Sequence, residues 1–170
     1  MPAGAKGTGP HPRSGLTLVE LLIVLGISGF LATLVSPLMF GSIGRNRLNI
    51  ASAEAVDALR EAQFTVMSGY APARYGVHFE AGKFVYFRGT TYSAGDANNV
   101  EHQLADGVTT TSVALSPGGA CAVATGVGNC DVHFASVDGS PTESGSVVFR
   151  GPDGTMATVV LNTVGMIDAN

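Results

Sequence analysis

The pattern of hydrophobic and polar positions divides the chain into three stretches. Residues 21–40, with the sequence LLIVLGISGFLATLVSPLMF, carry no charged side chain, and a run of this length is enough to cross a bilayer as a helix. Between Leu48 and Val66, apolar residues recur at intervals of three and four, which predicts an amphipathic helix. From Tyr75 onward the period falls to two, which is typical of strands. The pattern therefore predicts one long N-terminal helix followed by a β domain.

Local signals predict a bend and an end for this helix. Pro37 lies well inside the apolar run, where proline removes a backbone donor, so we expect a kink there and not an end. The amphipathic half is expected to continue to about Met67, because Gly69 and Pro72 are stop signals. Its apolar side needs a partner, which the apolar face of an antiparallel sheet provides. We therefore expect an α+β fold, with the helix packed on a small antiparallel β domain.

Alternation and turn residues together define the expected strands. They cover residues 75–79, 83–92, 108–115, 132–137, 146–150, 155–162 and 164–167. A turn at residues 81–82 joins the first two strands as a hairpin, and the Pro-Asp-Gly sequence at residues 152–154 is a strong turn signal. We expect a loop over residues 93–107 and a glycine-rich excursion, which holds both cysteines, over residues 116–130.

Composition and charge narrow the possible partners. The chain of 170 residues has a formal net charge of −4, so it offers no general attraction to nucleic acid or to anionic lipid. The basic residues after position 70 are only Arg74, Lys83, Arg88 and Arg150. A groove that tracks phosphates needs clustered positive charge, so these scattered residues on an acidic domain make a weak case for nucleic acid binding.

No set of residues in the sequence indicates catalysis or a bound cofactor. His78, His102 and His133 are dispersed along the chain, and no nucleophile motif, phosphate-binding loop or carboxylate pair accompanies them. We therefore expect a protein that is not an enzyme and that needs no cofactor.

The sequence GDANNVE is the candidate for calcium binding. It offers oxygen ligands from Asp96, Asn98, Asn99 and Glu101. Their spacing fits no complete calcium-binding loop, so a solvated turn is the favoured interpretation and no metal site is predicted.

The two cysteines, Cys121 and Cys130, lie close together in the sequence. If this part of the chain faces an oxidising space, they are free to form a disulfide, which would stabilise the domain by roughly 2.5–3 kcal/mol through the short loop it closes. Two buried free thiols are the alternative. A zinc site is not expected, because two cysteines without a nearby pair of histidines do not make one.

Glu20 is the unusual residue at the start of the apolar run. A carboxylate inside a membrane-spanning segment costs roughly 2.5–3.5 kcal/mol. The preceding residues, MPAGAKGTGPHPRSG, form a polar leader with Lys6 and Arg13, but the apolar run is too long for a secretory signal and no cleavage pattern follows it promptly. A plain membrane anchor leaves Glu20 unexplained. An interfacial residue near the helix start, where the helix dipole favours acids, is a further alternative.

Residues 14–22, SGLTLVELL, closely resemble the processing motif of type IV prepilins and pseudopilins. Members of that family have a basic leader that ends in glycine, then a hydrophobic residue, a glutamate at the fifth position after the cut, and a long apolar helix. The resemblance implies that prepilin peptidase cleaves between Gly15 and Leu16, and that the new amine of Leu16 is N-methylated. It also implies that Glu20 pairs with this amine on a neighbouring subunit during assembly, which lowers the cost of both charges. Pro37 falls where many members place a kinking proline.

The rest of the chain shows a weaker resemblance. The order of hairpins and the C-terminal sequence are similar to those of the H-type minor pseudopilins and minor pilins. The expected organisation is a cleaved leader at residues 1–15, a transmembrane and filament-core helix at 16–40, an amphipathic helix at 41–70 and an antiparallel β domain at 71–170.

This resemblance implies a structural subunit of a type IV pilus or of a type II secretion pseudopilus. Before assembly, it implies a single-pass protein of the cytoplasmic (inner) membrane whose C-terminal domain lies outside the cytoplasm. The implied partners are prepilin peptidase, other pilin or pseudopilin subunits, an inner-membrane assembly platform and membrane lipid. Two alternatives remain open: a DNA-binding minor pilin of an uptake (competence) pilus, and a single-pass anchored binding domain with no filament role.

Overall fold

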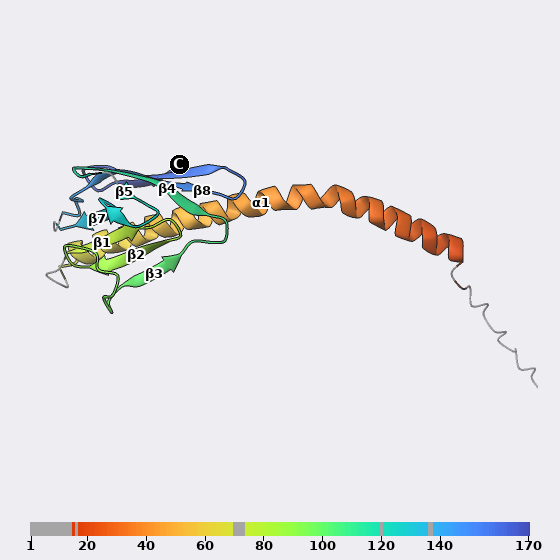
Figure 1. The fold of residues 1–170 in the computed structure, drawn as a ribbon, viewed down its shortest axis with the longest axis horizontal. Coiled ribbons are helices and arrows are strands. Elements are labelled where there is room, and N and C mark those ends of the chain that lie inside the picture. The colour runs from red at the N-terminus through yellow and green to blue at the C-terminus, as the bar shows by residue number, and fades with distance from the viewer. Residues whose placement is uncertain (1–14, 16, 70–73, 120, 136–137) are drawn as a thin grey trace, which may run out of the picture. The chain divides into compact units, whose positions relative to one another are not determined.

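The computed structural model describes residues 15, 17–69, 74–119, 121–135 and 138–170, except for the side chains of residues 34–42. The chain divides into two compact units, Met1–Met39 and Phe40–Asn170. One helix, α1 (Leu18–Met67), contributes to both units, and the strands β1 to β10 follow it in the second unit (Figure 1).

In the first unit, α1 is apolar on nearly every side. Its side chains are exposed from Leu18 to residue 33, and Leu18 and Phe30 are 73% and 66% exposed. Among the residues that the structure describes, no helix is both long enough and apolar enough to span a membrane. The span expected over residues 16–40 is therefore not confirmed and stays a prediction. The kink expected at Pro37 falls among the residues whose side chains lie outside the described part.

In the second unit, the remainder of α1 is amphipathic, as the spacing of its apolar residues predicts. Leu48, Leu59 and Val66 are buried on the side that faces the sheets. The helix ends at Met67, as expected. Gly69 follows with a φ of 62° and donates its N–H to the carbonyl of Val66 at 3.2 Å. Glycine adopts this left-handed conformation without a steric penalty, so it closes the helix.

Two four-stranded antiparallel sheets make up most of the β domain (Figure 1). The first sheet has the order β3-β2-β1-β7 and contains β1 (Tyr75–Phe79), β2 (Lys83–Arg88), β3 (Val100–Gln103) and β7 (Asp131–Phe134). The second has the order β10-β9-β8-β4 and contains β4 (Thr109–Ser116), β8 (Ser144–Arg150), β9 (Met156–Leu161) and β10 (Ile167–Ala169). A small two-stranded sheet pairs β5 (Cys121–Ala122) with β6 (Val127–Gly128).

One hydrophobic core joins the helix to both large sheets. Phe79 of β1 makes an edge-to-face contact with Phe149 of β8, with the ring centroids 6.4 Å apart. Phe79 also contacts Phe84 of β2 at 6.2 Å. These three rings are fully buried, and Leu59 of α1 belongs to the same cluster. The expected α+β fold, a helix packed on antiparallel sheet, is confirmed.

Gln63 of α1 adds a polar connection between the helix and two loops. Its side-chain amide donates to the carbonyl oxygens of Gly139 and Gly165, at 2.8 Å and 2.9 Å. Gly165 has a φ of 83°, and a Cβ atom built on it would lie 2.5 Å from the Gln63 nitrogen. Only glycine allows the backbone to approach the amide this closely.

The loop expected over residues 93–107 is wrong in part, because it contains β3. This strand pairs with β2 in a register that sets Lys83 opposite Gln103 and Tyr86 opposite Val100. β3 lies at the edge of its sheet and its side chains are mostly exposed. An edge strand needs no alternation of apolar and polar residues, so the sequence pattern gave no signal for it.

The last expected strand, at residues 164–167, is also misplaced. The side-chain oxygen of Asn162 accepts the N–H groups of Val164 and Met166, at 3.1 Å and 2.8 Å, and this contact holds a turn. β10 therefore begins only at Ile167. The Pro-Asp-Gly turn at residues 152–154 is confirmed, because Gly154 donates its N–H to the carbonyl of Gly151 at 3.0 Å.

The other strand boundaries differ by a few residues. The second expected strand, 83–92, ends at Arg88. The expected strand at 132–137 corresponds to β7, and residues 136–137 lie outside the described part of the chain. The glycine-rich excursion at 116–130 includes the short β5–β6 hairpin, which the sequence did not predict.

Candidate processing and assembly site

The candidate cleavage point lies just before the first turn of α1. Gly15 is exposed, and no heavy atom lies within 4 Å of a Cβ built on it. Leu16, the expected new N-terminal residue, lies outside the described residues.

Thr17 caps the N-terminus of α1. Its side-chain oxygen accepts the backbone N–H of Glu20 at 3.2 Å, and its carbonyl accepts the N–H of Leu21 at 3.1 Å. The first N–H groups of a helix have no partner inside the helix, so a capping threonine satisfies one of them. Thr17 and Glu20 also have the spacing of a capping box, in which Ser or Thr is followed three residues later by Glu or Gln.

Glu20 thus has a local role as well as the one that the resemblance implies. It is exposed in the first turn of α1, where the helix dipole stabilises an acid. In the described part of the chain, no side chain donates to its carboxylate or forms an ion pair with it. The carboxylate remains available to a partner outside these residues.

Exposed apolar side chains surround Glu20 along the first part of α1. The large ones are Leu18, Val19, Leu21, Leu22, Ile23, Val24, Leu25, Ile27, Phe30 and Leu31. A continuous apolar surface of this kind marks a site of interaction with another apolar surface. The structure thus brings together a capped helix start, an unpaired carboxylate and an apolar stretch.

Sequence reasoning missed the role of Thr17. The signal was present, because Thr17-Leu18-Val19-Glu20 has the capping-box pattern and stands directly before the apolar run. The capping-box pattern was overlooked because Glu20 also belongs to the prepilin motif.

The disulfide between Cys121 and Cys130 is confirmed, with the Cα atoms 4.9 Å apart. It connects β5 to the residue that precedes β7, and Cys130 is fully buried. The carbonyl of Cys130 accepts the N–H of Phe79 at 3.0 Å, so the disulfide holds its loop against the end of β1.

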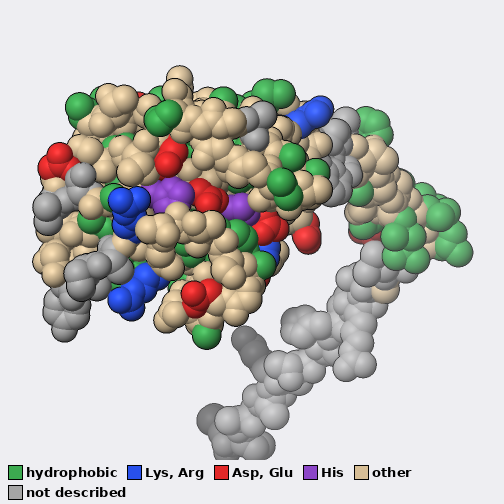
Figure 2. Space-filling model, turned by 60° about the vertical axis from the view of Figure 1, so that its left-hand side comes forward, with side chains coloured by type: hydrophobic (Ala, Val, Ile, Leu, Met, Phe, Trp, Pro, Cys, Tyr) green, Lys and Arg blue, Asp and Glu red, His purple; other side chains and the backbone are tan. Residues whose placement is uncertain are grey.

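Two histidines that are far apart in the sequence, His78 and His133, lie close together in the structure. His78 of β1 contacts Asp131 of β7 through Nδ1, and His133 of β7 contacts Glu143 through Nδ1 at 3.1 Å. His133 Nε2 lies 3.9 Å from Asp131, so the carboxylate stands between the two rings. The ring of Tyr92 stacks on His78 with the centroids 3.9 Å apart. Figure 2 shows histidine and acidic side chains side by side on one face of the molecule.

We call His78, Asp131, His133 and Glu143 the histidine–acid cluster. Burial raises the pKa of Glu143, but hydrogen bonds from the His133 side chain, the Thr142 hydroxyl and the His133 N–H outweigh it and lower this pKa below its ordinary value. Among the described residues, no group of three or more His, Cys, Asp or Glu side chains is arranged so that it could hold a metal ion. The contacts connect β1, β7 and the residue that precedes β8.

The residues considered for calcium do not converge on one point. The Asp96 carboxylate accepts the backbone N–H and the side-chain amide of Asn98, both at 2.8 Å, and so forms a turn. Glu101 lies in β3 and pairs with Lys83 at 2.7 Å. The arrangement agrees with the favoured interpretation of a solvated turn.

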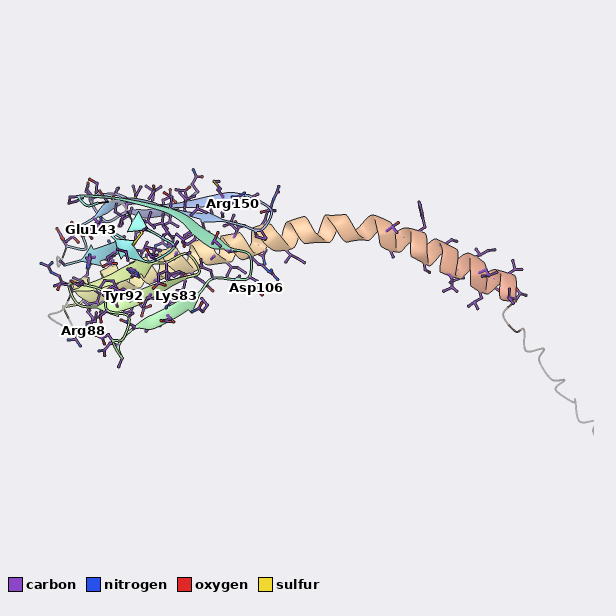
Figure 3. The ribbon with its side chains drawn as sticks, in the orientation of Figure 1. Lys83, Arg88, Tyr92, Asp106, Glu143 and Arg150 are labelled. Atoms are coloured by element: carbon purple, nitrogen blue, oxygen red, sulfur yellow. A yellow bond between two sulfur atoms is a disulfide. The ribbon has the colours of Figure 1, made fainter. Side chains whose placement is uncertain are left out.

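The basic residues of the β domain are spread over both sheets. Figure 3 shows Lys83 and Arg88 beside the first sheet and Arg150 beside the second. The Lys83 ammonium lies 2.7 Å from Glu101 and 3.9 Å from Glu80. The hydrogen bond to Glu101 and the nearby charges raise the pKa of Lys83 and offset its desolvation. This positive charge is already neutralised, so the scattered set forms no phosphate-binding groove.

Comparison with known protein families gives one match, at the N-terminus. Residues 10–36 match the family model described as the prokaryotic N-terminal methylation motif, a type IV prepilin-like signal. The matched residues include Gly15, Leu16 and Glu20 and continue into α1. No curated protein and no solved structure matches the chain. The motif supports a pilin-like subunit that is cut by prepilin peptidase and N-methylated.

Proposed function

We propose that this chain is a pilin-like structural subunit of a type IV pilus or of a type II secretion pseudopilus. The observation that carries the proposal is the methylation motif at residues 10–36, which leads directly into the exposed apolar part of α1. Its role is structural and not catalytic. The N-terminal part of α1 packs in a filament core, and the β domain is displayed on the outside.

Processing is the first step of the proposed mechanism. Prepilin peptidase hydrolyses the amide between Gly15 and Leu16, which leaves a carboxylate on Gly15 and an amine on Leu16. The amine then receives a methyl group and keeps its positive charge. The open space around Gly15 supports access to this bond.

The second step pairs two charges between subunits. The Leu16 amine of one subunit meets the Glu20 carboxylate of its neighbour, so neither charge stays alone in an apolar core. The unpaired carboxylate of Glu20 supports this step, and the Thr17 cap holds the first turn in which Glu20 lies. Pairing of Glu20 with the amine of its own chain is a competitor, because the two are one helical turn apart.

The proposed location follows from the same motif. Before assembly the apolar residues of α1 are held in the cytoplasmic membrane, with the leader in the cytoplasm and the β domain outside it. The Cys121–Cys130 disulfide supports an oxidising environment for the β domain. Contact with an inner-membrane assembly platform belongs to this proposal.

Within the family we assign the chain to the H-type minor pseudopilins and minor pilins. The order of its hairpins and its C-terminal sequence support this finer assignment. A DNA-binding role in an uptake pilus is less favoured, because Lys83 is neutralised by its acidic neighbours. Retardation of a DNA duplex by the protein in a mobility-shift assay at physiological salt would favour that role instead.

The proposal is tested by determining the N-terminal residue of the mature protein and by looking for this protein in assembled filaments. Mass spectrometry of the mature protein is expected to show methylated Leu16 as the first residue. Finding residues 1–15 retained in assembled filaments would contradict the proposal.

Two substitutions of Glu20 separate its charge from the other properties of its side chain at the helix start. Glu20→Ala removes the whole carboxylate side chain, whereas Glu20→Gln keeps its length and a capping-box residue type and removes only the charge. Each variant is produced together with the unsubstituted chain, and both are quantified in sheared filaments. If charge pairing matters, both variants are incorporated poorly although they are inserted and trimmed correctly. Normal incorporation of Glu20→Gln would show that Glu20 acts only at the helix start.

A further inference from the structure

Part of α1 in the second unit is not covered by the sheets. Its exposed residues include Ile50, Glu54, Asp57, Glu61 and Phe64. With 3.6 residues per turn, these five positions fall within an arc of about 80° around the helix axis. We call this set the uncovered face of α1.

The centre of the uncovered face carries three negative charges. Glu54 and Asp57 are three residues apart, and Asp57 and Glu61 are four apart, so they are neighbours on the helix and repel each other. In the described part of the chain, none of these carboxylates has an ion pair or a hydrogen-bond donor. No ion pair in the described part of the chain relieves this repulsion, and Arg60, which follows Asp57 by three residues, donates instead to the carbonyl of Ile167 at 3.5 Å.

Apolar side chains lie at both ends of this row. Ile50 precedes it and is 47% exposed, and Phe64 follows it and is 73% exposed. Scattered exposed apolar residues are common on soluble proteins. Here, however, two large apolar residues enclose a row of unpaired acids on one narrow arc, which is the composition of a docking face for a cationic partner.

The same helix carries an exposed cation on another side. The Arg45 side chain is 73% exposed, and its one ion-pair contact in the described chain is with Asp153 at 3.9 Å. Arg45 precedes the three acids by 9–16 residues, which corresponds to about 14–24 Å along the axis and to about 120–180° around it. The Arg45 side chain and the acidic row therefore cannot meet within one chain.

We infer that the uncovered face of α1 docks against the Arg45 side of a second copy of this chain. The two complementary charges lie on different sides of the helix, so the contact is heterologous and each copy has both halves free for further copies. The helices are then offset along their axes by about 14–24 Å, the distance that brings Arg45 level with the acids. The inference rests on the proposed function, because a heterologous contact that does not close produces a filament.

The charge of the uncovered face argues against other occupants. Three unpaired acids repel nucleic acid and anionic lipid. A cationic protein surface is the complementary partner, and Arg45 supplies one on the chain itself.

The test reverses the charges and then restores their complementarity. The variant Glu54→Lys/Asp57→Lys/Glu61→Lys is produced in cells that assemble the filament, and its amount in sheared filaments is compared with that of the unsubstituted chain. We expect incorporation to fall at least tenfold. Adding Arg45→Glu to the same chain is expected to restore it, because the two surfaces become complementary again with opposite sign.

Two further variants keep the test independent of folding. The triple change Asp96→Lys/Asp138→Lys/Asp168→Lys has the same effect on net charge but changes no residue of α1, and it is expected to leave incorporation unchanged. The second variant, Glu54→Gln/Asp57→Asn/Glu61→Gln, removes the repulsion within the helix, so the fold is kept while the attraction to Arg45 is lost. It is expected to reduce incorporation less than the lysine variant does.

The outcomes separate this inference from the proposed function. If the unsubstituted chain is incorporated and the lysine variant is incorporated equally, the inference is wrong and the proposed function stands. Loss of incorporation that Arg45→Glu does not restore also overturns it, because the partner is then not a second copy. Absence of the unsubstituted chain from filaments would overturn both.

Discussion

The two halves of α1 share a backbone conformation but differ in how their apolar side chains are covered. From Leu18 to Leu31 the large apolar residues are between 51% and 73% exposed. In the second half, Leu59 is 1% exposed and Ala62 is fully buried. The second half is amphipathic and packs against the sheets of its own chain, whereas the apolar side chains of the first half are exposed in the described part of the chain. An amphipathic pattern in a helix thus indicates packing within its own chain, whereas an apolar pattern on nearly every side indicates a partner outside it.

The largest expected effect comes from shortening one leucine in each half of α1. Leu59→Ala removes buried contacts and is expected to lower the free energy of unfolding of the β domain by about 2–5 kcal/mol. The matched change Leu22→Ala removes an exposed side chain, so the same quantity is expected to change by less than about 0.5 kcal/mol. Denaturant unfolding of the full chain in detergent, followed by near-ultraviolet circular dichroism of the tyrosines, measures both. Equal effects of the two changes would refute the contrast between the halves.

Removing the disulfide tests whether the second unit is stabilised independently of the first half of α1. Replacing Cys121 and Cys130 by serine is expected to lower the free energy of unfolding by about 2.5–3 kcal/mol, because the unfolded chain gains freedom. Protection of the amides in the first half of α1 against hydrogen exchange is expected to stay the same. Alkylation of both cysteines in exported protein without prior reduction would show that the disulfide does not form in cells.

The histidine–acid cluster is expected to make the stability of the β domain depend on pH. The folded state lowers the pKa of Glu143 from its ordinary value of 4.5, so its ionised form stabilises the β domain above that pH. This contribution is lost as the pH falls through the lowered pKa. Glu143→Gln is expected to destabilise the domain by about 1 kcal/mol at pH 7 and to have a smaller effect as the pH falls through the lowered pKa, as measured by thermal unfolding at each pH. A difference that does not depend on pH would contradict the assignment.

The smallest expected effect concerns the helix start. Thr17→Ala removes the cap and is expected to cost about 1 kcal/mol in the first turn of α1, while Thr17→Ser keeps the capping oxygen and serves as the control. Hydrogen exchange of the first amides of α1 reports this change, whereas unfolding of the β domain does not. Faster exchange in both variants would mean that the threonine methyl group, and not the capping oxygen, protects this turn.

Features that depend on neighbouring residues were predictable from the sequence. The helix end at Met67 follows from Gly69, and the turn after Gly151 follows from the Pro-Asp-Gly signal. The α+β class follows from the change of period between Val66 and Tyr75. The capping role of Thr17 was equally local and could have been predicted.

Features that depend on strand pairing were not predictable in this way. β3 has no apolar alternation, because an edge strand is specified by the backbone groups of its neighbour. The histidine–acid cluster needs the register that sets His78 opposite Asp131, more than 50 residues apart in the sequence. A shift of this register by one residue would turn Asp131 and His133 toward the core, so the contact exists only after the fold is formed.

The Gln63 amide gives the β domain a mechanical property. Through the carbonyls of Gly139 and Gly165 it fastens α1 to the connection between β7 and β8, which links the two large sheets, and to the turn between β9 and β10 of the second sheet. Tension applied along α1 is therefore passed through one side chain to the connection between the sheets and to the second sheet. Because the strands within each sheet are joined to their neighbours by rows of hydrogen bonds, the load is shared among many bonds. The Gln63 side chain is thus one point at which a pulling force on the helix passes into the β domain.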